Sequence, residues 1–225
     1  DYSWYAAAVN RCKKAGDWRG ACEELCRMWR AAAAGRQGAA TVAHNAAISA
    51  CERCARWRRA VALSAEMLHR CLEVDVFTYS ASVSACEKAR QWQRAVALLS
   101  AAGCREADRS PVVWNGAISA CGATEQWAQA LTLFDAITSP APSSLLGREG
   151  AVQPTVITCN AAVGACARAA QWQLALLLSL GSSTADVVTY GSLIGAFYKG
   201  SSWELAALTL DGMHQKQPGP KPNTI

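Results

Sequence analysis

The sequence contains little of what marks enzymes and membrane proteins. It has only three histidines and no match to a phosphate-binding loop, a G-x-G-x-x-G dinucleotide loop or a G-x-S-x-G nucleophile elbow. We therefore expect a protein that is not an enzyme. No run of 18 apolar residues is free of charges and turn residues, so we expect no membrane span. The seven prolines interrupt few helices.

Alanine is abundant, and the overall composition is that of a folded helical protein. Apolar residues make up 52% of the chain and charged residues 17%, which is enough apolar surface for a core. Alanine is the best helix former, so the composition favours helices over strands. The net charge of +5 permits a nucleic-acid partner without requiring one.

The eleven cysteines are an odd number, and we interpret them as reduced thiols. Cys51-x-x-Cys54 has the spacing of a metal site, but no second pair accompanies it. We therefore expect buried thiols there, with no metal and no cofactor. The chain begins at Asp1 without a leader and ends at Ile225 inside a repeat unit. We expect a piece of a longer protein, with any targeting segment outside it.

Tryptophan recurs along the chain and sets the phase of an internal repeat of about 35 residues. The recurring residues are Trp18, Trp57, Trp92, Trp127, Trp172 and Trp203. Six residues before each lies Cys12, Cys51, Cys86, Cys121, Cys166 or Phe197, and three residues after each lies Ala21, Ala60, Ala95, Ala130, Ala175 or Ala206. Apolar residues at helical spacing flank a polar break in each unit, which predicts two helices per repeat. We expect the Trp row to pack in the interior rather than to stack on bases.

The repeat divides the whole chain into consecutive units of one array, residues 1–225. The predicted units are 2–40, which is degenerate, 41–75, 76–110, 111–155 with an inserted loop at 139–153, 156–186 with a shortened second helix, 187–223, and the start of another at 224–225. Such changes of length belong in turns between helices.

The openings of the units carry a specific resemblance. They read T-V-A-H-N-A-A-I from Thr41, V-F-T-Y-S-A-S-V from Val76, P-V-V-W-N-G-A-I from Pro111, V-I-T-C-N-A-A-V from Val156 and V-V-T-Y-G-S-L-I from Val187. This pattern resembles the pentatricopeptide repeat, whose first helix opens V-x-T-Y-N-x-x-I. The resemblance implies an all-α fold, a right-handed α-solenoid of stacked helix-turn-helix hairpins.

The tetratricopeptide repeat is the nearest alternative, with 34 residues and an early tryptophan in its first helix. Here the tryptophan opens the second helix. The corresponding alternative function is a helical scaffold that binds proteins. A third reading is an RNA enzyme whose catalytic domain lies beyond Ile225.

The resemblance implies that each repeat faces one RNA base, which is read by the fifth residue of the first helix and the last residue of the unit. The predicted readers are Asn45 with Asp75, Ser80 with Ser110, Asn115 with Thr155, Asn160 with Asp186, and Gly191 with Asn223. The family's pairing rules imply a core target of 5′-U-R-Y-U-3′. Gly191 departs from the pattern, as does the first unit. Asn and Ser near a helix start are also ordinary capping residues.

Two further sets recur at fixed phase. The second position of the first helix holds the predicted base-stacking residues Val42, Phe77, Val112, Ile157 and Val188, which simple core packing also explains. Eight residues after the fifth position lie the predicted phosphate-contacting residues, the cation row: Lys14, Arg53, Lys88, Arg168 and Lys199. A solvated charge at a helix end is the alternative for each.

Taken together, the repeat predicts sequence-selective binding of single-stranded RNA. The resemblance implies a chloroplast or mitochondrial location and a role in RNA processing, stability, editing or translation. We expect a monomer that has protein partners in an RNA-processing complex and no membrane partner.

Overall fold

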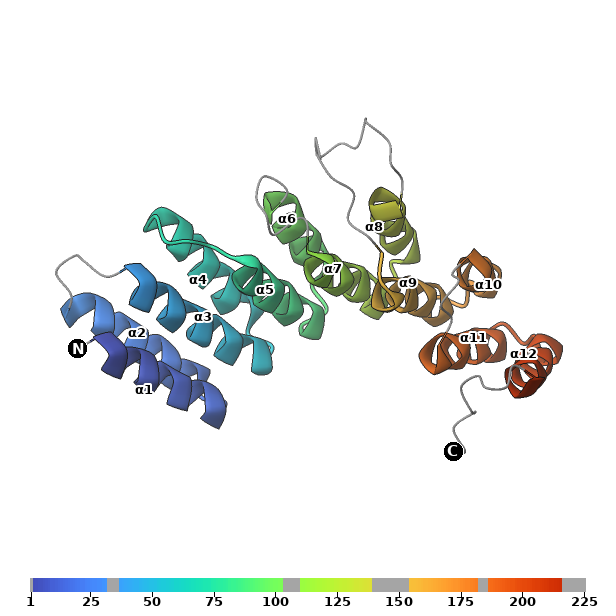
Figure 1. Cartoon of the computed structure of the whole chain (residues 1–225), viewed down its shortest axis with the longest axis horizontal. Helices are drawn as coiled ribbons and strands as arrows, with labels where there is room; N and C mark the ends of the chain where they lie inside the picture. Colours follow the sequence, from blue (N-terminus) through green and yellow to red (C-terminus); the bar gives the residue numbers. More distant parts are fainter. Residues whose placement is uncertain (1, 32–36, 103–109, 139–153, 182–185, 216–225) are drawn as a thin grey trace. The chain divides into compact units, whose positions relative to one another are not determined.

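The computed structural model describes residues 2–31, 37–102, 110–138, 154–181 and 186–215. Within these ranges the chain forms twelve α-helices and no strand (Figure 1). The helices are α1 (Tyr2–Ala15), α2 (Trp18–Ala31), α3 (Gln37–Arg53), α4 (Trp57–His69), α5 (Val76–Lys88), α6 (Trp92–Ala102), α7 (Pro111–Ala123), α8 (Trp127–Thr138), α9 (Val156–Arg168), α10 (Trp172–Gly181), α11 (Val187–Lys199) and α12 (Trp203–Gln215). The prediction of an all-α fold is confirmed.

Several features of the predicted repeats fall outside these ranges or differ from them. The inserted loop 139–153, Asn223 and the residues 224–225 lie outside the described residues. Helix α3 begins at Gln37, four residues before the predicted start of its unit, because alanines 39 and 40 extend the helix backwards.

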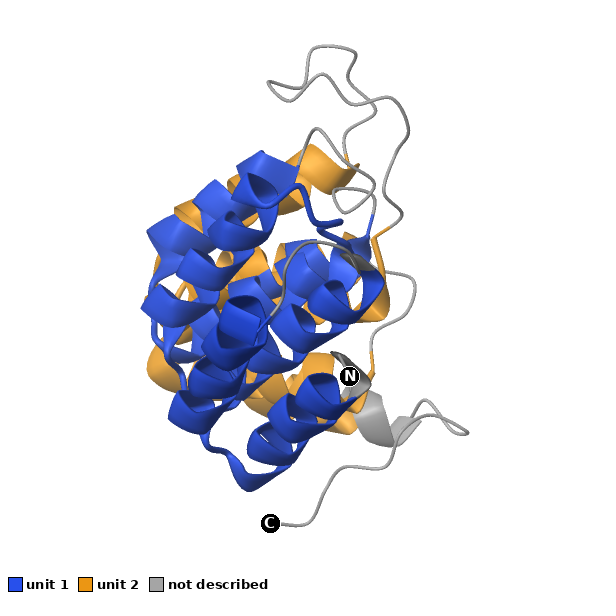
Figure 2. Cartoon of the chain, turned by 90° about the vertical axis from the view of Figure 1, so that its left-hand side faces the viewer, with its two compact units in different colours: residues 1–116 blue, residues 117–225 orange. Residues whose placement is uncertain are grey.

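The chain divides into two compact units, residues 1–116 and 117–225, with the boundary inside α7 (Figure 2). In unit 1 the first helices α1, α3 and α5 pack on one another. Helices α2 and α4 each pack on their own first helix and on the first helix of the next repeat. In unit 2, α9 and α11 pack in the same way, with α10 against both. Each unit is therefore built from helical hairpins stacked as in an α-solenoid.

The predicted packing positions form the core of this stack. The cysteines six residues before each tryptophan are fully buried in four repeats, and their place is taken by the buried Phe197 in the last. The alanines three residues after the tryptophan are also fully buried, namely Ala21, Ala60, Ala95, Ala130 and Ala175. Small side chains at these points allow the two helix layers to approach closely.

Burial also sets the chemistry of the core thiols. Desolvation raises the pKa of Cys86, Cys121 and Cys166 to about 11. These thiols are protonated at neutral pH and unreactive. The ten cysteines that the structure describes are all free, as the sequence predicts.

The turn between the two helices of a repeat explains the constant spacing between cysteine and tryptophan. In the second repeat the Arg56 amide donates to the Cys51 carbonyl at 2.8 Å, and the Ala55 amide donates to the Glu52 carbonyl at 3.1 Å. This pair of bonds is a Schellman motif, which places one residue in the left-handed region. The same motif recurs in six turns, at Gly16, Ala55, Arg90, Glu125, Ala170 and Ser201, with φ between 52° and 73°.

The tryptophan row is less buried than the sequence suggests. Trp172 packs its ring 6.0 Å from the ring of Phe197. Trp203, by contrast, is 72% exposed. The expectation of an interior packing role is therefore wrong at Trp203, and the other five rings are half-buried.

Candidate nucleic-acid interface

The structure brings together one predicted reader pair in unit 1. The Asn45 side-chain amide donates to the Asp75 carboxylate at 3.4 Å. The Thr78 hydroxyl donates to the Asn45 Oδ1 at 2.7 Å. Asp75 also caps α5, accepting the Thr78 backbone N–H at 2.8 Å. The two partners fix the Asn45 amide with its nitrogen toward the carboxylate.

The same arrangement occurs in unit 2. The Asn160 amide donates to both Asp186 oxygens, at 3.0 and 3.2 Å, and the Thr189 hydroxyl donates to the Asn160 Oδ1. Asp186 caps α11 and forms a capping box with Thr189. The capping role that the sequence offered as an alternative is therefore real for both aspartates, and each cap also contacts the asparagine of the preceding repeat.

The hydrogen bonds around Asp186 keep it ionised. Desolvation acts to raise the pKa of its carboxyl. The hydrogen bonds from the Thr189 amide, the Thr189 hydroxyl and the Asn160 amide lower the pKa by more than desolvation raises it. The net effect is a pKa below the ordinary aspartate value. The site thus presents a permanent negative charge beside an oriented amide at neutral pH.

Thr78 and Thr189 belong to the candidate site, and the sequence patterns did not single them out. Both lie three residues after a capping aspartate, at the T of the V-x-T-Y pattern. The D-x-x-T spacing is a recognisable capping signal. It indicates the cap, but the bond from threonine back to the previous repeat's asparagine depends on how the repeats stack.

Among the described residues, no hydrogen bond joins the two members of the Ser80–Ser110 or Asn115–Thr155 pair. Asn223, the predicted partner of Gly191, lies outside the described residues. Ser80 donates to the Phe77 carbonyl at 3.0 Å, and Ser110 is half-buried. Thr155 caps α9 through the Thr158 backbone N–H. Asn115 is half-buried in unit 1, and its Oδ1 has no hydrogen-bond partner in the described part of the chain. Gly191 is exposed, with open space around the position of a Cβ.

The predicted base-stacking residues lie on the surface. Their exposed fractions are 52% for Val42, 48% for Phe77, 58% for Val112, 66% for Ile157 and 60% for Val188. Apolar side chains at a core position are buried, so the core interpretation fails at all five. A regular series of exposed β-branched and aromatic side chains is instead suited to contact with a ligand.

The cation row has a structural role that the sequence did not reveal. Arg53 donates to the Lys13 carbonyl at 2.8 Å, Arg168 donates to the Gly122 carbonyl at 2.7 Å, and Lys199 donates to the Arg168 carbonyl at 3.0 Å. Each of these cations therefore satisfies a carbonyl at the C-terminal end of the preceding first helix.

Two members of the cation row differ from this pattern. Lys88 forms an ion pair with Glu52 at 3.0 Å, and the side chain of Lys14 is exposed. All five cations are exposed. An arginine has five N–H donors, and the bonds of Arg53 to the Lys13 and Lys14 carbonyls use one nitrogen, so capping leaves donors for a further anion.

No group of three or more His, Cys, Asp or Glu side chains in the described ranges is arranged to hold a metal ion. None of the described helices combines the length and the apolar character needed to cross a membrane.

Comparison with known proteins supports the fold. No protein-family model and no curated protein matches the sequence. Two crystal structures of the pentatricopeptide repeat protein PPR10, each in complex with an 18-nt psaJ RNA element, are similar to the chain with TM-scores of 0.53 and 16% identity. One of the two is a cysteine-to-serine variant. Each match covers 96% of this chain and 35% of the length of PPR10. The repeat pattern and the helix packing agree with this likeness: the chain has the pentatricopeptide repeat fold, an α-solenoid of stacked helical hairpins.

Proposed function

We propose that the chain binds single-stranded RNA and reads about one base per repeat. The observation that carries this proposal is the Asn–Asp–Thr constellation, which recurs in unit 1 and unit 2 with the same donors and acceptors. Both PPR10 structures to which the fold is similar are RNA complexes, which supports the choice of ligand class.

The chemistry of the constellation suits the edge of a pyrimidine. A uracil edge offers one N–H donor between two carbonyl acceptors. Asn160 supplies an amide with a donor and an acceptor, and the ionised Asp186 supplies acceptors. Asn45 supplies the same amide groups, and the Asp75 carboxylate oxygens act as acceptors. We infer that these two repeats read the uracils at the ends of the predicted 5′-U-R-Y-U-3′ core.

The neighbouring residues complete the proposed interface. The exposed Phe77 and Val188 each lie two residues after a capping aspartate, one step before the threonine that holds the asparagine. This placement suits contact with the face of a base that the polar pair reads at its edge. The cation row, including Lys14 and Lys88, is proposed to attract the phosphates.

The wider role follows from the same proposal. We propose that the array is not catalytic and acts in transcript processing, stability, editing or translation. We also propose an organellar location and a monomer that recruits protein partners.

A protein-binding scaffold is the second candidate. The observation that favours it is the exposure of Leu177 and Leu180 on α10, at 64% and 74%, since exposed apolar side chains mark protein contacts.

A selection from randomised single-stranded RNA tests the proposal. The purified chain is expected to enrich short RNAs that share the pattern U-R-Y-U. The control is a chain with Asn45→Ala and Asn160→Ala together, which is expected to bind RNA without enriching the terminal uracils. Recovery of no motif by the wild-type chain, or tighter binding to duplex than to single strands, would contradict it.

A further inference from the structure

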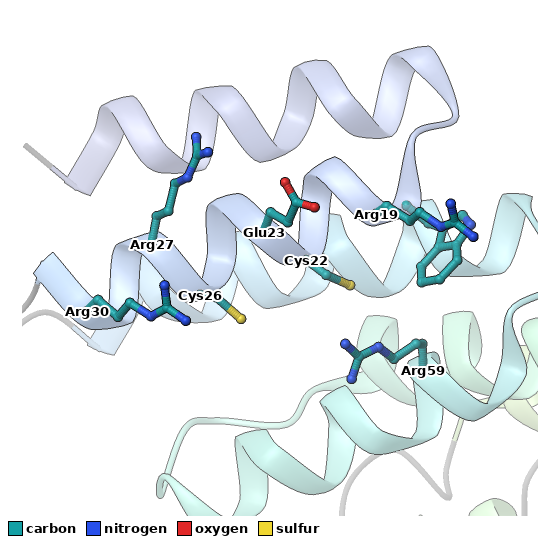
Figure 3. Close-up of a pocket in the computed structure, with 8 residues that line it drawn as sticks. Arg19, Cys22, Glu23, Cys26, Arg27, Arg30 and Arg59 are labelled. Carbon is teal, nitrogen blue, oxygen red and sulfur yellow. The ribbon is translucent and has the colours of Figure 1, made fainter.

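The outer helices of unit 1 form a groove that the proposed RNA-reading face does not use. A cavity of about 460 Å³ lies along α2 and reaches α4. Its lining includes four arginines and one glutamate: Arg19, Arg27, Arg30, Arg59 and Glu23. The first helices supply the predicted readers, so this groove belongs to the other helix layer. Figure 3 shows Arg59 reaching from its own helix toward the α2 surface that carries Cys22 and Cys26.

The groove continues into a second basic cavity. A cavity of about 320 Å³ is lined by Ala55, Arg56, Trp57, Arg58 and Arg59. Arg59 is common to both cavities, so they form one continuous surface. We call it the outer arginine surface: Arg19, Arg27, Arg30, Arg56, Arg58 and Arg59. Along α2 alone it runs from Arg19 to Arg30, about 16 Å at the rise of an α-helix, which is too long for a single small anion.

The positive charge of this surface is poorly neutralised. All six arginines are exposed. Within the described residues, the one ion pair formed by these six is that of Arg27 with Glu24, at 2.7 Å. The hydrogen bond to Cys51 is the main cause that lowers the pKa of the Cys22 thiol, and the nearby Arg59 charge adds to it. A surface of this kind attracts an anionic partner.

Aromatic rings lie among the arginines. The guanidinium carbons of Arg19 and Arg56 lie 5.4 and 5.3 Å from the centre of the Trp18 ring. The guanidinium carbon of Arg58 lies 5.3 Å from the centre of the Trp57 ring. Guanidinium groups over aromatic rings keep in-plane N–H donors for phosphate oxygens, and the rings and guanidinium planes are flat faces suited to base stacking. An acidic peptide would use the charges but not the flat faces, so the composition favours a nucleic-acid strand.

We propose that the outer arginine surface is a second RNA-binding surface, which holds a strand by its phosphates without selecting its sequence. It is separate from the reader pairs on the first helices and does not depend on base reading. A chain with both surfaces binds its target on one face and another stretch of RNA on the other.

The test uses a short single-stranded RNA that lacks the predicted target, and compares three forms of the full chain by calorimetry. The wild-type chain is expected to bind this RNA. The variant Arg27→Gln, Arg30→Gln and Arg59→Gln is expected to lose at least tenfold in affinity, and about 2 units of the salt slope, at about 0.7 per lost phosphate contact. The matched control is Arg11→Gln, Arg90→Gln and Arg94→Gln, which removes the same charge from exposed positions elsewhere in unit 1 and is expected to bind like wild type.

A footprint locates the bound strand. Cys26 is exposed and lines the groove, whereas Cys71 is exposed and does not. Bound RNA is expected to slow the alkylation of Cys26 and leave that of Cys71 unchanged, as read by peptide mass spectrometry. This readout needs no substitution, so a folding defect in the variant cannot mimic it.

The outcomes are distinct. Equal binding by the triple variant and its control, or an unprotected Cys26, overturns the proposal. Polyglutamate that competes as well as RNA of equal charge overturns the choice of occupant and indicates an acidic protein. Loss of selection for the target RNA with an intact Cys26 footprint contradicts base reading and leaves the outer surface in place.

Discussion

The first helices of the repeats carry similar sites in the two units, whereas the second helices, which form the outer layer, differ between the units. Asn45 with Asp75 in unit 1 and Asn160 with Asp186 in unit 2 have equivalent partners. The Asn45 amide makes one bond to its carboxylate, at 3.4 Å, whereas the Asn160 amide makes two, at 3.0 and 3.2 Å. The outer helices α2 and α4 carry arginines along their exposed faces. Helices α8 and α10 contain no lysine or arginine, and α10 exposes Leu177 and Leu180.

This difference shows which features every repeat needs in order to stack and which can vary between repeats. The core cysteine and alanine and the turn recur in both units because every hairpin needs them to stack. The outer face is not held by stacking between second helices, since α2 and α4 pack on first helices. It can therefore diverge, becoming basic in one unit and apolar in the other.

Substitutions in the cores of the two units are expected to have the largest effect on stability. Phe197→Ala in unit 2 removes a buried aromatic ring and is expected to cost about 3–5 kcal/mol of unfolding free energy. Met67→Ala, at a fully buried position in unit 1, is expected to cost about 2–5 kcal/mol. Hydrogen-exchange mass spectrometry should place each loss mainly in its own unit, because repeat arrays are stabilised by nearest neighbours. Equal loss of protection across both units in both variants would contradict the division into units.

Substitutions in the cation row are expected to have the next largest effect, on both stability and RNA binding. Arg168→Gln removes the bond to the Gly122 carbonyl and Arg53→Gln the bond to the Lys13 carbonyl. Each is expected to cost about 1 kcal/mol, because the arginine is exposed and solvent screens its charge. Each is also expected to lower the salt slope of RNA binding by about 0.7. Denaturant titration and binding at several salt concentrations measure the two. A stability loss with an unchanged salt slope would leave these cations as helix caps alone.

The turns of the two units offer a matched pair of stabilising changes. Ala55→Gly in unit 1 and Ala170→Gly in unit 2 relieve a left-handed backbone at φ 52° and 57°. Glycine avoids the steric cost of the Cβ but loses more entropy on folding, so we expect a net gain of about 0.5–1 kcal/mol each. Thermal melting measures the gain, and Gly16→Ala, at φ 73°, is the opposite control. A fall in melting temperature in both glycine variants would refute the account of the turn.

The smallest effect is the pH dependence of the Asp186 cap. Its folded pKa is lowered by hydrogen bonds from Thr189 and Asn160 after desolvation has raised it. The stabilisation is therefore complete above the unfolded pKa, near 4, and is lost as pH falls through the lowered folded value. At this partly exposed position we expect less than about 1 kcal/mol. Denaturation between about pH 5 and 2.5 should cost the wild type more stability than it costs Asp186→Asn, in which the other carboxyl groups still titrate. An equal loss in the two proteins would contradict this role of the cap.

The sequence predicts the repeat better than it predicts the interface. The positions of Cys51, Ala60 and Trp57 specify a hairpin, because the core and the turn are local and recur at fixed offsets. Thr78 could be recognised as a capping partner of Asp75, but its bond to Asn45 spans two repeats. The second role of Arg168 likewise depends on the Gly122 carbonyl of the preceding repeat.

The outer arginine surface is the clearest case of what the sequence does not show. Arg30 and Arg59 lie on different helices, and no periodic motif connects them. The cavity that both arginines line forms because α2 and α4 both pack on α3. A charge run such as R-W-R-R at Arg56 is a cue, but it does not distinguish a solvated face from a groove.

Paired substitutions in the protein and the RNA test whether the Asn–Asp pairs read single bases. Dissociation constants are measured for the wild type, Asn45→Ala and Asn160→Ala on 5′-U-R-Y-U-3′ RNAs in which the first or the last uracil is changed. Each variant is expected to lose about 1–3 kcal/mol of binding free energy on the full target. Asn45→Ala should then become indifferent to the first uracil alone, and Asn160→Ala to the last alone. An equal loss on every RNA, with the preference for both uracils retained, would contradict base reading by these pairs.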